Sequence, residues 1–139
     1  MRRSDRPVSP LTRSRRRILL GLAAAGCSAG IRPARAHAAL VRSDPSRRAV
    51  LTQSPSHIRL WFSERIEPDY SSISVLDAAG HAVPTGPAAV SPADARLLIL
   101  DLPPLAPGQY TVRFRINSID GHILEASYQF ALEAAKGGE

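Results

Sequence analysis

Alternation of apolar and polar residues is strongest in two segments of the chain. Residues 58–62 (IRLWF) place Ile58, Leu60 and Phe62 at every second position, and residues 110–116 (YTVRFRI) repeat the pattern with Tyr, Val, Phe and Ile. Side chains two positions apart lie on the same face of an extended chain, so each segment has one apolar face and one polar face. Both segments are predicted to be half-buried β-strands.

Three more segments have strand character and are separated by turn residues. They are residues 72–76 (SISVL), 96–100 (RLLIL) and 123–132 (ILEASYQFAL). The apolar face of the last segment comprises Leu124, Ala126, Tyr128, Phe130 and Leu132. The intervening DAAGH, PTGP, SPAD and PPLAPGQ are rich in Gly, Pro and Asp, which favour turns. Many short strands at this spacing predict an all-β fold of about seven strands, either an immunoglobulin-like sandwich or a Greek-key β-barrel.

A tyrosine at the start of one strand favours the sandwich. Tyr110 follows Gly108 by two residues in LAPGQY, an arrangement similar to the tyrosine corner of immunoglobulin-like sandwiches. The only helix-like segment is the closing EAAKGGE, which we expect to be frayed. The sequence therefore predicts one β domain over residues 37–133 and a flexible tail over residues 134–139.

The first 36 residues differ in composition and predict an export signal. Arginines cluster up to Arg17, an apolar run ILLGLAAAGCSAGI follows, and Ala-Arg-Ala at 34–36 offers a signal-peptidase site. The apolar run is shorter than the ~20 residues that span a bilayer. SRRRIL at 14–19 resembles the twin-arginine consensus, although an ordinary Sec leader also fits adjacent arginines. The mature chain is predicted to begin at His37 in the periplasm or another extracytoplasmic space.

The net positive charge of the chain belongs to this leader. Of the 18 basic and 12 acidic residues, nine arginines and one aspartate lie in residues 1–36, which therefore carry a net charge of +8. The remaining nine basic and 11 acidic residues leave the rest of the chain with a net charge of −2. Charge thus gives no reason to expect that the mature protein binds nucleic acid, or a membrane except through a partner.

The single cysteine, Cys27, also lies in the leader. A mature chain that begins near residue 37 therefore has neither a disulfide nor a thiolate ligand. Cys27 is either a small apolar residue of the signal or, if AAGC serves as an imperfect lipobox, the site of a lipid anchor.

Cleavage after Ala36 would make His37 a metal chelator. A free N-terminal histidine offers its α-amine and its ring Nδ1 to one metal ion, and the amine pKa of roughly 7.7–8.0 lets a metal displace the proton near neutrality. Processing one residue earlier or later would remove this chelate.

Two more potential ligands lie in SIDGH, residues 118–122. Asp120 and His122 share one face of an extended chain, although Asp-Gly is also a common turn dipeptide. Together with His37 they give three nitrogens and one carboxylate oxygen, a donor set that suits Cu(II) in a tetragonal site. We predict one Cu(II) ion per chain, bound by His37, Asp120 and His122.

Several segments of the mature sequence are similar to those of a known family. HAALVRSDPS, PSHIRLWFSERIEP, LAPGQYTVRFRINSIDGH and YQFAL resemble the CopC family of periplasmic copper-resistance proteins, over nearly all of residues 37–132. The resemblance implies an immunoglobulin-like or Greek-key β domain that binds Cu(II) through the mature N-terminal histidine and Asp-Gly-His. These positions are His37, Asp120 and His122. Some members carry a second, methionine-rich Cu(I) site, but Met1 is the only methionine here, so the resemblance is to the Cu(II)-only type.

Other polar residues are assigned smaller roles. Glu64 of the FSE segment is predicted to lie near the site and to accept a hydrogen bond from a ligand. His57 opens a strand on its polar face and His81 follows a glycine in a turn, so both are expected to be solvated bystanders. Arg113 and Arg115 are expected on the solvated face of a strand.

Three functions fit this sequence, and a copper carrier or buffer without turnover, acting in copper resistance or homeostasis, is favoured. The second is a copper-dependent oxidative enzyme of the lytic polysaccharide monooxygenase type, because such enzymes bind copper through an amine and two imidazoles. Most aromatic residues here occupy core-like positions, however, and Asp120 would fill the equatorial position that oxygen chemistry needs open. The third is delivery of copper to a CopD-like inner-membrane protein, a partner that the resemblance implies. We expect a monomer that is not an enzyme.

Overall fold

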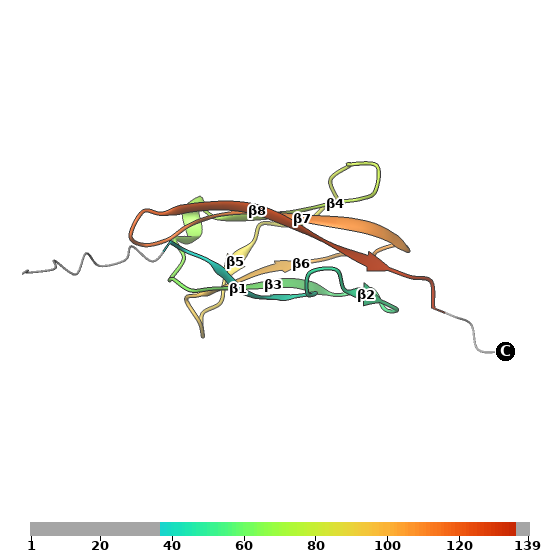
Figure 1. The fold of residues 1–139 in the computed structure, drawn as a ribbon, viewed down its shortest axis with the longest axis horizontal. Coiled ribbons are helices and arrows are strands. Elements are labelled where there is room, and N and C mark those ends of the chain that lie inside the picture. The colour runs from blue at the N-terminus through green and yellow to red at the C-terminus, as the bar shows by residue number, and fades with distance from the viewer. Residues whose placement is uncertain (1–36, 136–139) are drawn as a thin grey trace, which may run out of the picture. The chain divides into compact units, whose positions relative to one another are not determined.

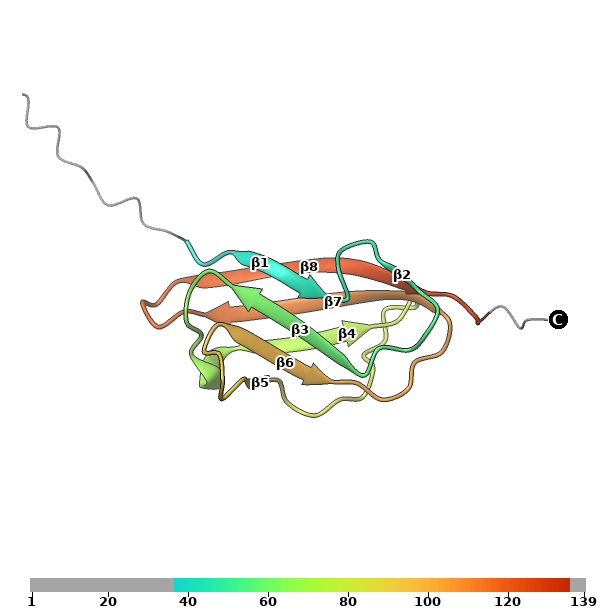
Figure 2. The same ribbon diagram turned by 90° about the horizontal axis from the view of Figure 1, so that it is seen from below.

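The computed structural model describes residues 37–135, drawn as ribbons in Figures 1 and 2. The predicted export signal and the last four residues of the predicted tail lie outside the described residues. The described chain forms β1 (Leu40–Asp44), β2 (Val50–Leu51), β3 (His57–Phe62), the 3-10 helix η1 (Pro68–Tyr70), β4 (Ser72–Leu76), β5 (Ala89–Val90), β6 (Leu97–Asp101), β7 (Gly108–Asn117) and β8 (Ile123–Leu132).

The strands form two four-stranded sheets that pack face to face. One sheet has the order β1-β3-β6-β5 and the other the order β2-β8-β7-β4, and Figure 1 shows the two sheets edge-on as two layers. Neighbouring strands are antiparallel except β2, which runs parallel to β8. The predicted all-β, immunoglobulin-like sandwich is confirmed, with eight strands instead of about seven.

The alternating apolar residues of the central strands form the core. Ile58, Leu60 and Phe62 of β3 are buried. Four apolar residues of β7, which occupy every second position of that strand in the facing sheet, are buried as well: Tyr110, Val112, Phe114 and Ile116. Phe62 contacts Phe114 edge-on across the two sheets, with ring centroids 5.6 Å apart. Full burial of such a side chain contributes roughly 1.5–3 kcal/mol, so these two strands hold the layers together.

Three strands and one buried position differ from the sequence expectation. Strands β2 and β5 were not predicted because each has only two residues. Strand β1 was not predicted because its pairing with β3 shifts register between Leu40 and Arg42, and such a bulge breaks the alternation that identifies a strand. Ala126 was expected on the buried face of β8 but is exposed. Strand β2 pairs only with Ala131 and Leu132, so the first part of β8 is an edge without a neighbour on that side.

The tyrosine corner is confirmed at the start of β7. The Tyr110 hydroxyl donates a hydrogen bond of 2.6 Å to the carbonyl of Ala106, four residues earlier. This bond fixes the approach to β7 at one end of the sandwich. Within residues 37–135, no helix is long and apolar enough to cross a membrane.

The other end of the sandwich carries the segments that the sequence singled out. The β7–β8 hairpin, the start of β1 and η1 meet there (Figures 1 and 2). An isolated bridge between Ile66 and Ser118 joins the segment after β3 to this hairpin. Positions far apart in sequence, 37 and 118–122, are thereby brought together.

Candidate metal centre

The turn between β7 and β8 places Asp120 and His122 at the tip of the hairpin. The Ser118 N–H donates to the His122 carbonyl (2.9 Å) and the Gly121 N–H donates to the Ser118 carbonyl (2.8 Å). Gly121 has φ +86°, a conformation that glycine adopts without strain. Asp120 and Gly121 therefore form the turn, and the same turn presents Asp120 and His122 side by side.

The side chains of Asp120 and His122 are in direct contact. His122 Nδ1 lies 2.9 Å from Asp120 Oδ2, but this contact lacks hydrogen-bond geometry, and Nδ1 is a buried atom without a hydrogen-bond partner. A buried nitrogen whose only polar neighbour is poorly aligned for a hydrogen bond loses part of that bond's free energy. A cation that bound both atoms would remove this cost.

The environment of Asp120 favours its charged form. The hydrogen bond from the Ser118 hydroxyl is the largest influence and holds the pKa of the Asp120 carboxyl below its ordinary value of 3.8. Partial desolvation acts in the opposite direction, and the neighbouring His122 lowers the pKa further. Asp120 is therefore a carboxylate, the form that binds metal, throughout the neutral and mildly acidic range.

The chain is anchored immediately after His37. Ala38 is only 4% exposed, and Ala39 exchanges two hydrogen bonds with Ser63. The Ala39 N–H donates to Ser63 Oγ and the Ser63 N–H donates to the Ala39 carbonyl, both at 2.9 Å. His37 itself is exposed. The start of the described chain is thus held against the segment that follows β3, while the His37 side chain stays accessible.

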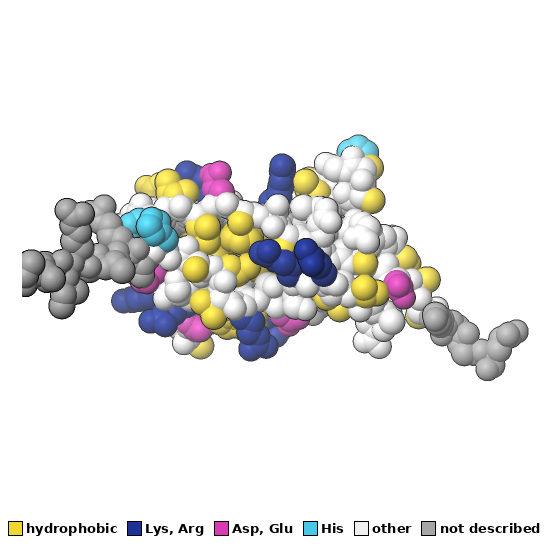
Figure 3. All heavy atoms as spheres, in the orientation of Figure 1, with side chains coloured by type: hydrophobic (Ala, Val, Ile, Leu, Met, Phe, Trp, Pro, Cys, Tyr) yellow, Lys and Arg dark blue, Asp and Glu magenta, His cyan; other side chains and the backbone are white. Residues whose placement is uncertain are grey.

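The rings of His37 and His122 lie close together. Their centroids are 5.6 Å apart and the ring planes are tilted by 51°, and Figure 3 shows histidine side chains at the end of the domain where the described chain begins. Two imidazoles bound to one ion at 2.0–2.1 Å have centroids roughly 4.5 Å (cis) to 6.3 Å (trans) apart. The two rings are therefore within the range that a shared metal requires.

The distance between His122 Nδ1 and Asp120 Oδ2 also fits a shared metal. Bonds of 2.0–2.1 Å place two cis ligand atoms ~2.8–3.0 Å apart in a square-planar or octahedral site. The observed separation of 2.9 Å has this value. The atoms are thus spaced as neighbouring ligands on one ion.

The side chains alone do not complete a site. No group of three or more His, Cys, Asp or Glu side chains within residues 37–135 is arranged so that it could hold a metal ion. The predicted set also counts the main-chain nitrogen of His37, which is an amide joined to Ala36 in the full-length chain. The structure brings His37 to His122 and Asp120 to His122, and the main-chain nitrogen of His37 is not a free amine in the full-length chain.

Glu64 lies close to Asp120. Both residues line a shallow hollow, together with Arg65 and Ile119. Glu64 is half-buried, but in the described part of the chain its side chain makes no hydrogen bond to a predicted ligand. Its predicted position near the site is consistent with this hollow, whereas its predicted hydrogen bond remains a prediction.

His57 and His81 lie at the opposite end of the sandwich. His57 opens β3, where Nδ1 is 2.7 Å from the Ser56 hydroxyl and Nε2 is 3.4 Å from Asp101. His81 lies in the turn after β4, 3.8 Å from Asp77. Neither is brought to His37 or His122, as expected of bystanders.

Two serines near the predicted ligands were not assigned a role from the sequence. Ser63 binds the main chain two residues after His37, and Ser118 binds Asp120 and the main chain of His122. Both stand within the FSE and SIDGH segments that carry the family resemblance. The sequence signal was present, but a serine hydroxyl has no preferred partner until the fold is known.

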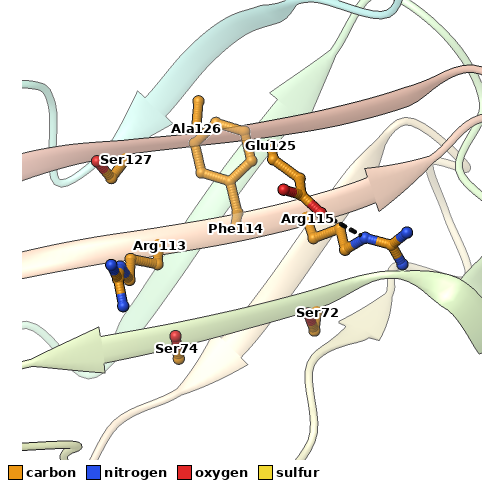
Figure 4. A pocket seen from close by; sticks show the side chains of 8 residues that line it. All are labelled: Ser72, Ser74, Arg113, Phe114, Arg115, Glu125, Ala126 and Ser127. Atoms are coloured by element: carbon orange, nitrogen blue, oxygen red, sulfur yellow. Dashed lines mark hydrogen bonds and ion pairs between the residues drawn. The ribbon is translucent and has the colours of Figure 1, made fainter.

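A second surface hollow, on the outer face of the β8-β7-β4 sheet, is unrelated to these residues (Figure 4). Arg113 and Arg115 of β7 lie between serines of β4 and residues of β8, and Arg115 donates a 2.7 Å hydrogen bond to Glu125. The hollow contains no histidine. The predicted solvated face of β7 is confirmed.

The aromatic residues offer no flat platform beside the histidines. All seven Phe, Trp and Tyr residues lie within the described chain, and five of them are buried. Trp61 is half-buried, with the Arg42 guanidinium 4.5 Å above its ring. Tyr70 is the one exposed aromatic side chain of the described residues.

Comparison with known sequences gives a family match. The CopC domain matches residues 40–133. Protein YobA of Escherichia coli K12 is 34% identical over 99 residues, which cover 70% of this chain and 80% of YobA. The copper transport protein CutJ of Bacillus subtilis strain 168 is 26% identical over 104 residues, which cover 74% of this chain and 19% of CutJ.

Solved structures agree with this match. CopC from Methylosinus trichosporium OB3b superposes with a TM-score of 0.68 at 41% identity, covering 74% of this chain and all of that one (100%). PcoC from Escherichia coli, a methionine-rich copper-resistance protein, superposes with a TM-score of 0.63 at 27% identity, covering 70% of this chain and 100% of PcoC. The chain therefore belongs to the CopC family of copper-resistance proteins.

Proposed function

We propose that the mature protein carries or buffers one Cu(II) ion per chain, held by the α-amine and Nδ1 of His37, by His122 and by Asp120. The observation that carries this proposal is the convergence of the three residues: the two imidazoles lie 5.6 Å apart, and the buried, unbonded Nδ1 of His122 lies 2.9 Å from Asp120 Oδ2. Three nitrogens and one carboxylate oxygen make a donor set that suits Cu(II).

From His37 onward, the sequence lacks the soft sulfur ligands that Cu(I) prefers. Met1 and Cys27 are the only sulfur-containing residues, and both precede His37. Thioether and thiolate ligands select Cu(I), whereas amine, imidazole and carboxylate ligands do not. In this respect the chain differs from PcoC, which is described as methionine-rich. We therefore propose tight binding of Cu(II) and weak binding of Cu(I).

Export and cleavage belong to the same proposal. The α-amine of His37 forms only when the Ala36–His37 bond is cut, which a signal peptidase acting after Ala-Arg-Ala would do. The protein would then bind copper outside the cytoplasm, in the periplasm or an equivalent space. The precursor, with an amide in place of the amine, would lack one of the four donors and, with it, the chelate ring that the amine and Nδ1 of His37 form together.

The arrangement supports a carrier rather than an oxidative enzyme. Asp120 would occupy a position on the ion that oxygen needs, and the only exposed aromatic side chain of the described residues is Tyr70. A flat polysaccharide would find a single exposed aromatic side chain, Tyr70, at this end of the described chain. With ascorbate and oxygen, we expect no copper-dependent oxidised product from chitin or cellulose.

A second role, delivery of copper to a membrane protein such as a CopD-like importer, is favoured by the surface around the site. The described residues include five exposed large hydrophobic side chains, and four of them lie in segments at the end that carries His37 and His122: Val41, Tyr70, Ile119 and Ile123. Exposed apolar side chains grouped around a site are typical of an interaction surface. In CutJ the matched region is 19% of a longer copper transport protein. We propose a monomeric carrier that presents this end to its partner.

The decisive experiment adds one alanine ahead of His37. The extension turns the α-amine into an amide and leaves every side chain and the β fold in place. We expect Cu(II) affinity to fall by several orders of magnitude, measured by competition with a chelator, with a changed electron paramagnetic resonance spectrum. The protein that starts at His37 is the matched control. Equal affinity of the two proteins would exclude the amine as a ligand.

A further inference from the structure

Ser118 is the one buried polar residue of the described chain that lies beside the proposed ligands. It is 1% exposed and is the only buried polar or charged residue of the described chain. A buried hydroxyl destabilises a fold by about 1–3 kcal/mol unless it makes hydrogen bonds. Its hydroxyl therefore needs hydrogen-bond partners, and those partners are Asp120 and the main chain of His122.

The hydroxyl of Ser118 connects the two proposed ligands of the hairpin. It donates a short hydrogen bond to Asp120 Oδ1 and accepts one of 3.2 Å from the His122 N–H. A hydroxyl has one proton, and the charged carboxylate is a stronger acceptor for it than the neighbouring carbonyl of His122. One side chain thus holds the carboxylate of Asp120 and the main chain of His122 at the same time.

Ser118 is itself held rigidly by the main chain. Its N–H donates to the His122 carbonyl, its carbonyl accepts from Gly121, and the bridge to Ile66 joins it to the segment after β3. Ile119, the next residue, donates to the Arg65 carbonyl (3.1 Å). The hydroxyl is therefore a fixed point from which the exposed end of the turn can be ordered.

Asp120 needs such a fixed point because its side chain is largely open to solvent. The Asp120 side chain is 52% exposed, and an exposed aspartate otherwise populates several χ1 rotamers. The bond to Oδ1 selects one rotamer and leaves Oδ2 facing His122 Nδ1 at 2.9 Å. Since ~2.8–3.0 Å is the spacing of cis ligands, this rotamer is the one that presents Oδ2 as a neighbouring ligand.

We infer that Ser118 is a positioning residue for copper: it fixes the carboxylate of Asp120 so that Oδ2, with His122, is arranged for the ion before it arrives. The inference rests on the proposed function, because it assumes that Asp120 binds the metal. It adds that the two carboxylate oxygens of Asp120 have different partners: Oδ1 accepts the hydrogen bond from Ser118, and Oδ2 binds the ion.

The test uses Ser118→Ala in the mature protein that starts at His37, with Cu(II) alone as the probe. Loss of a residue that orients a ligand weakens metal binding ~10–100-fold, and we expect a loss of this size in a competition titration. Ser118→Thr keeps the hydroxyl and should restore most of the affinity. Ser74→Ala, an exposed serine of β4 away from the site, is the matched control and should bind as the wild type does.

Two further measurements separate positioning from a general effect on the fold. In the metal-free protein, the Hα–Hβ couplings of Asp120 should report one χ1 rotamer in the wild type and an average in Ser118→Ala. In a double-mutant cycle, Ser118→Ala should cause no further loss of affinity once Asp120→Ala is present, because Ser118 acts through Asp120.

The outcomes are distinct. Wild-type affinity in Ser118→Ala, an unchanged Asp120 rotamer, or losses that multiply in the cycle would each overturn the role of Ser118. If Asp120→Ala itself binds Cu(II) as tightly as the wild type, the proposed ligand set fails, and the positioning role fails with it. If both single variants lose Cu(II) affinity and the double variant loses no more than Asp120→Ala does, the result supports both the ligand set and the positioning role.

Discussion

The two ends of the sandwich both carry histidine–carboxylate pairs, and only one end combines them into a candidate site. At the hairpin end, His122 and Asp120 approach to 2.9 Å and the His122 side chain is 28% exposed. At the other end, the His57–Asp101 and His81–Asp77 distances are 3.4 and 3.8 Å, and the Asp101 and His81 side chains are more than 80% exposed (87% and 82%).

The difference lies in what surrounds each pair. His57 and His81 each have one carboxylate and no second histidine nearby, whereas His122 also has His37 within 5.6 Å and a buried Nδ1 without a hydrogen bond. Two ligands in solvent bind a metal weakly, because water competes for every position. A third and fourth donor held by separate segments of the fold distinguish a site from a surface ion pair.

Of the changes considered, a lower pH should have the largest effect on copper binding at the hairpin end. The proposed site needs a deprotonated amine and two neutral imidazoles, so protons compete with Cu(II) for three donors, and binding should weaken by several orders of magnitude between pH 7 and pH 5. Asp120 contributes nothing to this loss, because its pKa lies below 3.8 and it stays ionised over this interval. Competition titrations at several pH values measure the slope, and a flat profile would exclude the histidines.

Removal of one histidine from each end compares the ends directly. His122→Ala should weaken Cu(II) binding by at least ~100-fold, since loss of a ligand exceeds the ~10–100-fold effect of residues that only orient ligands. His57→Ala and His81→Ala are the matched controls and should bind copper as the wild type does. The electron paramagnetic resonance spectra of the three variants provide a second measurement. A change in the copper spectrum of His57→Ala or His81→Ala would show that the far end also binds copper.

Gly121→Ala should disturb the hairpin end through its backbone. A β-carbon at Gly121 would meet no atom within 4 Å, so the strain comes from φ +86°, which costs an L residue ~1–2 kcal/mol. We expect this loss of unfolding free energy in urea titrations, together with weaker copper binding, because the turn that aligns Asp120 and His122 can relax. Gly86→Ala also has open space but no such φ, so it should be neutral.

Tyr110→Phe should disturb only the opposite end and has the smallest expected effect. The substitution removes the hydrogen bond to the Ala106 carbonyl, worth ~0.5–1.5 kcal/mol of unfolding free energy. Tyr70→Phe, at an exposed position, should leave stability unchanged. Copper affinity should be equal in both variants and in the wild type, and a loss in Tyr110→Phe would show that the two ends are coupled.

The strands with regular alternation were readable without the fold. Ile58, Leu60 and Phe62 predicted the buried face of β3 because period-two burial follows from strand geometry alone. Strand β1 was not predicted, because its bulge interrupts the period-two alternation. Ala126 was predicted to be buried but is exposed, because burial at the edge of a sheet depends on which strand lies alongside. Local pattern cannot specify a neighbour.

The candidate site divides in the same way. The sequence itself determined three features, because residue type and short-range spacing are enough to specify them. They are the chemistry of His37, Asp120 and His122, the absence of sulfur ligands after residue 36, and the turn at Gly121. Only the tertiary structure decided that residue 37 lies against residue 122, that Ser63 and Ser118 hold the two segments, and that His57 and His81 lie at the far end. These are contacts between segments distant in sequence, and they exist only when the two sheets pack over one core.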